Sequence, residues 1–147
     1  MKFEGITAIN APREKVWTAL IDPYLVSQCA PGLQSMEVID PNKLFKASVS
    51  VGFGAVKVNF DANVEFVELR EPDFAQMRAH GKAPGSGVDV RAEMRLSDGQ
   101  AGVTELGWTA DVVVVGTIAS MASRLMGGIT QKLTNQFFDC IKAKIEA

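Results

Sequence analysis

The stretch VKVNFDANVEF, residues 56–66, alternates strictly between apolar and polar side chains. In a β-strand successive side chains point to opposite faces, so this alternation predicts one covered face and one face in water. That pattern is typical of antiparallel sheets. The apolar positions are Val56, Val58, Phe60, Ala62, Val64 and Phe66.

The same alternation recurs on both sides of this stretch and predicts an array of strands. Turn sequences rich in Gly, Pro and Asp separate the strands. GKAPGSG, residues 81–87, joins two of them and opens no helix, so we expect a hairpin turn there and not a phosphate-binding loop. The other predicted strands are residues 2–9, 44–51, 74–80, 88–96 and 105–114.

Helices are predicted at two places. PREKVWTALID, residues 12–22, places Val16, Trp17 and Leu20 on one apolar face, and DPYLVSQCAPG, residues 22–32, gives a second short helix capped by Asp22. The last segment, residues 117–146, carries an apolar stripe at helical spacing and would span roughly 45 Å as one helix. Its members are Ile118, Met121, Leu125, Ile129, Leu133, Phe137 and Ile141.

These elements predict one α+β domain over residues 1–147. A curved antiparallel sheet wraps around the long C-terminal helix, and two short helices follow the first strand. With 15 Lys and Arg against 17 Asp and Glu, and no basic face, the composition argues against a nucleic-acid partner. The start lacks the apolar centre of a signal peptide, no segment of 18 apolar residues exists, and the two cysteines are far apart, so we expect a cytoplasmic protein.

Each predicted inner face contains a small side chain, and the space beside it must be filled. Either the helix packs closely there, or a ligand occupies a cavity. These side chains are Ala47, Ala62, Ala79, Ala92 and Ala110.

Catalytic and metal-binding residues are not apparent. The single histidine, His80, shares the polar face with Gln76 and Arg78, so we expect it on the surface. One His and two isolated Cys give no metal-ligand spacing. Cys29 has no predicted base beside it, and both Cys29 and Cys140 are expected to be buried structural cysteines.

Three segments give the chain a resemblance to a known family. They are VWTALIDPYLVSQCAPG (16–32), VGFGAVKVNFDANVEF (51–66) and TELGWTADVVVVGTIASMASRLM (104–126). With the order of elements, they resemble the CoxG subunit family of carbon monoxide dehydrogenase, part of the START-like SRPBCC superfamily with the helix-grip fold. This chain stops at KAKIEA, without the apolar C-terminal tail that some members carry.

The resemblance implies an apolar cavity between sheet and helix and an accessory role for a carbon monoxide dehydrogenase-type molybdenum hydroxylase. That role would be membrane recruitment, maturation, or handling of a quinone-like lipid, at the inner face of the membrane. The family suggests no catalytic residues, and we expect no cofactor beyond a bound lipid or quinone. A pure assembly factor and a cyclase- or hydrolase-like enzyme remain alternatives. The predicted cavity lining is Phe60, Met77, Val90, Met94, Trp108, Met121, Leu125, Ile129 and Leu133.

Two further features bear on access to this cavity. Gly127-Gly128 interrupts the long helix, either as a tolerated weak spot on its outer face or as a hinge. Phe53, between two glycines in a hairpin, either folds back onto the protein or is an exposed docking tip. We expect the first half of the helix and the Phe53 hairpin to form a gate.

Overall fold

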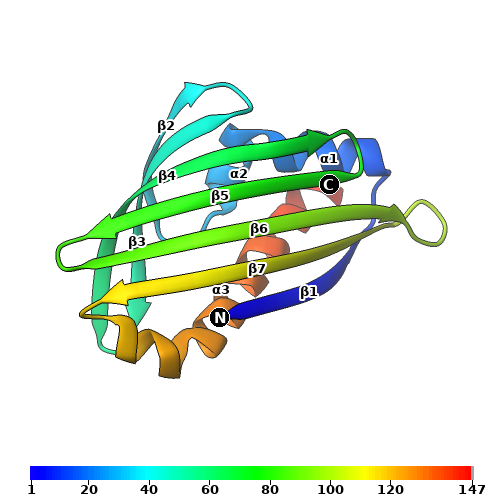
Figure 1. The fold of residues 1–147 in the computed structure, drawn as a ribbon. Coiled ribbons are helices and arrows are strands. Elements are labelled where there is room, and N and C mark those ends of the chain that lie inside the picture. Colours follow the sequence, from blue (N-terminus) through cyan, green and yellow to red (C-terminus); the bar gives the residue numbers. More distant parts are fainter. Residues whose placement is uncertain (147) are drawn as a thin grey trace.

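A curved, seven-stranded antiparallel sheet forms the body of the molecule (Figure 1). The computed structural model describes residues 1–146, and its strands lie in the order β1-β7-β6-β5-β4-β3-β2. The α+β helix-grip architecture is therefore confirmed. The strands are β1 (Lys2–Ile9), β2 (Leu33–Asp40), β3 (Leu44–Phe53), β4 (Val56–Arg70), β5 (Phe74–Ala83), β6 (Ser86–Asp98) and β7 (Thr104–Gly116).

The alternation of side chains sets the two faces of the sheet as expected. In β4 the even-numbered side chains from Val58 to Phe66 are sheltered and the odd-numbered ones are exposed, because only one face is covered by helices. A register shift between Phe66 and Glu68 then reverses the parity, so that Leu69 joins the core. One strand, β2, was not among the predicted ones. Two register shifts interrupt its pairing with β3 and blur its alternation.

Three helices cover the concave face. They are α1 (Arg13–Ile21), α2 (Pro23–Cys29) and α3 (Ala119–Glu146). Figure 1 looks onto the sheet from its outer face, with α1 and α2 together at one end; α3 begins below β7 and then continues behind the strands. The Asp22 side chain accepts a hydrogen bond from the Tyr24 N–H at 3.0 Å, which confirms the predicted cap of α2. No helix within residues 1–146 is long and apolar enough to cross a membrane.

The long helix is continuous through the two glycines, for which a tolerated weak spot and a hinge were both considered. α3 runs through Gly127 and Gly128, and both glycines are exposed. A Cβ added at either position would meet no atom within 4 Å. The glycines therefore lie on an open side of an unbroken helix.

The two cysteines form a disulfide, which corrects the expectation of two separate thiols. Cys29 ends α2, and Cys140 lies on α3 with the two Cα atoms 5.4 Å apart. This separation lies in the usual range for a disulfide. Cys29 is buried as expected, whereas Cys140 is only partly buried, and the inference from isolated cysteines to a reducing cytoplasm loses its basis.

The buried core is divided into two clusters. The first, here the helical-end cluster, lies where α1, α2 and the end of α3 meet the sheet, and includes Trp17, Leu106 and Ile141. The second, the hairpin-end cluster, gathers the β3–β4 turn and the start of α3 around Phe53, Phe60, Ile118 and Ala122. The middle of the concave face belongs to neither cluster.

Candidate functional site

The middle of the concave face lies outside both core clusters, and its inward side chains are small. Although α3 covers this face, all five of the inward alanines remain partly accessible. In the register, Ala47 faces Ala62, Ala62 faces Gly81, and Ala92 faces Ala110. Rows of small side chains thus cross neighbouring strands where the two core clusters leave a gap. We call this region, around the five alanines, the central hollow.

The helix contributes few apolar side chains above the central hollow. Ile129 packs against the hairpin-end cluster, and Phe137 packs against the helical-end cluster. Leu133, one turn from each, belongs to neither cluster and is partly accessible. The helix therefore packs on the sheet on both sides of Leu133, while Leu133 itself stays outside both clusters.

The nine predicted lining residues divide according to these regions. Met77, Val90 and Leu133 belong to neither cluster and border the central hollow. Met94 and Trp108 pack against the helical-end cluster, at one end of the hollow. Leu125 is 37% exposed and lies at the surface of α3. The remaining three, Phe60, Met121 and Ile129, are in or against the hairpin-end cluster.

Phe53 is buried, so its interpretation as an exposed docking tip is wrong. It is 2% exposed and packs in the hairpin-end cluster with Ile118 and Ala122. The turn beyond it, at Gly54, lies against α3, since a Cβ on Gly54 would stand 3.7 Å from Leu125 Cδ1. The hairpin and the first half of α3 are therefore joined by side-chain packing. Whether they move together as a gate remains a prediction.

A second opening lies between the edge strand β1 and α3. This β1–α3 groove has a volume of about 420 Å³, and residues 3–7 of β1 form one wall. Trp108 lies at its base, close over Gly5: a Cβ on Gly5 would stand 2.6 Å from the indole Nε1. Trp108 therefore borders both the groove and the central hollow.

The α3 wall of this groove is mostly polar, which was not predicted. Gly127 and Phe138 belong to it together with six polar residues. The spacing of three and four residues marks one continuous face of the helix. The helical periodicity of the polar residues could have revealed this face, whereas the prediction used only the apolar stripe of the helix. The polar members are Thr130, Gln131, Thr134, Asn135, Asp139 and Lys142.

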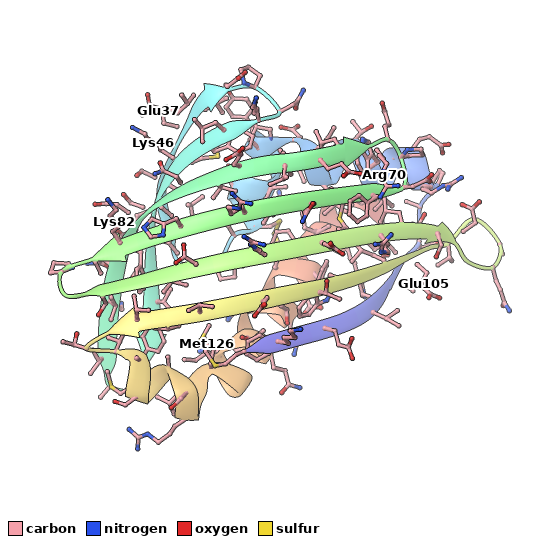
Figure 2. The ribbon with its side chains drawn as sticks, in the orientation of Figure 1. Glu37, Lys46, Arg70, Lys82, Glu105 and Met126 are labelled. Carbon is pink, nitrogen blue, oxygen red and sulfur yellow. A yellow bond between two sulfur atoms is a disulfide. The ribbon has the colours of Figure 1, made fainter. Side chains whose placement is uncertain are left out.

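Charged groups of the sheet lie on its outer face. His80 was expected on the surface, and its Nδ1 lies 2.6 Å from Asp89 Oδ1 on the neighbouring strand, with both side chains exposed. Figure 2 shows Glu37 near Lys46, which the register places opposite one another on β2 and β3.

Among residues 1–146, no three His, Cys, Asp or Glu side chains are grouped so that they could hold a metal ion.

Solved structures show the same fold. A conserved protein from Geobacillus kaustophilus matches with a TM-score of 0.91 and 27% identity, covering 99% of this chain and 95% of that one. The Zhui aromatase/cyclase from a Streptomyces species matches with a TM-score of 0.76 and 16% identity, covering 99% and 93%. A protein from Thermus thermophilus matches with a TM-score of 0.71 and 11% identity, covering 99% and 97%.

Sequence comparison assigns the family. No curated protein sequence matches this chain significantly. The family model that describes the CoxG subunit of carbon monoxide dehydrogenase matches residues 5–146. This match spans nearly all of the chain, from the middle of β1 to the end of α3. The chain therefore belongs to the CoxG family, as the three sequence segments indicated.

Proposed function

We propose that this protein is a non-catalytic accessory protein that binds one apolar molecule, a lipid or a quinone, in the central hollow. It would serve a molybdenum hydroxylase of the carbon monoxide dehydrogenase type through membrane recruitment, maturation or handling of an electron carrier. The family description supports the partner, and the fold supports a ligand-binding accessory protein. No resident cofactor or metal is part of the proposal.

The observation that carries this proposal is the partial accessibility of the five inward alanines beneath α3. Protein interiors are packed at close to crystal density, and burial of apolar surface is the main favourable term in folding. An apolar molecule in the hollow would restore that packing. Met77 and Met94 border the hollow, and flexible methionine side chains can adapt to ligands of different shape.

An enzymatic role has less support. The similarity to an aromatase/cyclase is at 16% identity and concerns the fold. General acid–base catalysis needs a titratable group that reaches the reacting atoms. Along β4 and β6, between residues 57 and 95, the charged side chains alternate with the apolar ones that face α3, and they therefore point away from the hollow.

The proposed location is the cytoplasm, at the inner face of the membrane by peripheral contact. Disulfides are rare in a reducing cytoplasm, so the Cys29–Cys140 bond is the feature through which this location can be tested. Measuring the thiol content of the protein immediately after denaturing lysis of its host would decide this point.

Native mass spectrometry of protein purified from its own host tests the function. A retained lipid or quinone is expected, and protein without any bound molecule would favour a pure assembly factor. Titration with a short-chain ubiquinone analogue should change the fluorescence of Trp108, which borders the hollow. Trp17 is buried in the helical-end cluster, so a Trp108→Phe variant should lose the response while keeping the Trp17 signal. An unchanged spectrum at saturating analogue and at saturating fatty acid would contradict the proposal.

A further inference from the structure

The edge strand β1 has backbone groups that its neighbour β7 does not use. The terminal amine of Met1 donates to the Val112 carbonyl at 2.8 Å, and the Val112 N–H donates to the Met1 carbonyl at 2.7 Å. In an antiparallel pair, residues that exchange both bonds alternate with residues that exchange none. The backbone N–H and C=O groups of Glu4 and Ile6 therefore point away from β7, toward the free edge of the sheet.

These free groups face the β1–α3 groove. Glu4 and Ile6 are both part of its wall. The five β1 residues of that wall span about 17 Å, and the α3 residues 127–142 span about 22 Å. At the far end of β1, the Asn10 N–H donates to Glu146 Oε2 at 2.8 Å, which joins the strand to the end of the helix. The dimensions fit an extended segment of about five residues.

The two edges of the sheet differ in how they are protected. β2, at the opposite edge, carries two register shifts, and such irregularities hinder pairing with a further strand. β1 pairs with β7 over all eight residues without a shift. Its edge is therefore regular enough to receive another strand.

We propose that β1 binds an extended segment of a partner protein, which lies in the β1–α3 groove as an eighth strand. Residues 127–142 of α3 line the groove, so a second copy would have to bring its own sheet edge past this helix, whereas a single strand would not. Inward side chains of the segment would meet Thr130 and Thr134, which favours small polar residues. An outward side chain would lie beside Ile6, which is 74% exposed, and this favours an apolar residue.

A substitution at Ile6 tests the strand pairing. Proline removes the N–H that points into the groove, and the ring is tolerated at this edge position because β7 does not use that N–H. The matched control, Ile6→Thr, shortens the side chain and keeps the N–H. The probe is a phage-displayed library of random heptapeptides selected on the whole protein. Selected peptides should bind Ile6→Pro at least tenfold more weakly than Ile6→Thr.

A second measurement guards against a folding defect in the proline variant. Gln131→Trp fills the groove from the exposed helix side and should also weaken the selected peptides at least tenfold. Hydrogen exchange of the Glu4 and Ile6 amides in the parent protein should slow at least tenfold when a selected peptide is bound.

Three results would overturn the proposal. They are selection that enriches no peptide, binding that is insensitive to both Ile6→Pro and Gln131→Trp, and unchanged exchange at Glu4 and Ile6. Light scattering could instead show dimers that Ile6→Pro breaks. That result would assign the edge to a second copy of the chain and would also contradict the proposal. The groove would be assigned to the apolar ligand instead if Gln131→Trp loses binding of the quinone analogue and the parent protein binds no peptide. Trp108 borders both the groove and the hollow, so quinone-analogue binding is measured here by isothermal titration. Leucine at Ala62 and Ala92, which lie outside the groove lining, tests the hollow alone, so the two proposals can fail separately.

Discussion

Gly5 is the residue on which the arrangement of the β1–α3 groove depends most strongly. The indole of Trp108, its partner in the register, lies where a side chain at position 5 would be. We expect Gly5→Ala to lower the free energy of unfolding by about 1–3 kcal/mol, because the indole must shift or the strand must separate. Denaturant unfolding measures the loss, and the fluorescence of Trp108 should change in the folded protein.

Gly107 provides the matched control for this substitution. It lies beside Trp108 in β7, pairs with Ile6, and has no atom within 4 Å of its would-be Cβ. Gly107→Ala should therefore be neutral or slightly stabilising. Equal destabilisation by the two substitutions would show that the contact between Gly5 and Trp108 is not the cause.

Odd or even position along a strand predicts which face of the sheet a side chain points to, but only within the residues that are recognised as strand. The inward alanines were assigned correctly because they lie within long alternating runs. For Phe53 the same rule was available, since Phe45, Val49 and Val51 share its parity in β3. The predicted strand ended at Val51 because Gly52 resembles a turn residue, and the burial of Phe53 was therefore left open.

Among the elements, α2 and the C-terminal half of α3 are fastened together by the disulfide. The two cysteines are 111 residues apart in sequence, and cross-linking over a long loop restricts the unfolded chain most. Replacing both with alanine should lower the free energy of unfolding by about 2–5 kcal/mol. A reductant should destabilise the parent by a similar amount and leave the double variant unchanged.

Thiol labelling gives a separate check on the pairing. Cys29 or Cys140 labelled by a thiol reagent in the unreduced, folded protein would show that the bond is absent. The sequence alone could not reveal the disulfide, because the approach of α2 to α3 depends on how both helices pack on the sheet.

The two glycines of α3 test the proposed gate. Both lie within the helix and have open space beside them, so replacing both with alanine should stabilise the protein by up to about 2 kcal/mol. If the first half of α3 opens to admit ligand, uptake and release of a fluorescent apolar probe should both become slower in stopped-flow measurements. Ser123→Ala, on the same half of the helix, is the control for a general gain in helix propensity.

Equilibrium affinity should change less than the rates in the double-alanine variant. Exchange of the probe as fast as in the parent would place the access route elsewhere. The β1–α3 groove is then the next candidate, since it reaches Trp108.

For the molecule as a whole, the sequence predicts the architecture because alternation and helical spacing are local signals. Six of the seven strands and all three helices follow from them, and β2 is lost where bulges disturb its pattern. The division of the core into two clusters could not be predicted in this way. It depends on how the long helix crosses a curved sheet, which is a property of the assembled fold.

The proposed function depends above all on an apolar ligand in the hollow between the two clusters. Ala62 and Ala92 lie on different strands within it, and leucine at both positions would occupy the space that the ligand needs. Because the added side chains fill an existing hollow, we expect unfolding stability to be unchanged or higher. Asn63→Leu, on the outward face of β4, adds an apolar side chain of the same kind outside the hollow.

Isothermal titration of a short-chain ubiquinone analogue, or of the lipid recovered from the host, into these variants tests whether the ligand occupies this space. We predict that Ala62→Leu/Ala92→Leu loses at least tenfold in affinity while melting no lower than the parent, and that Asn63→Leu binds like the parent. Unchanged affinity in the folded double-leucine variant would show that the hollow is not the binding site.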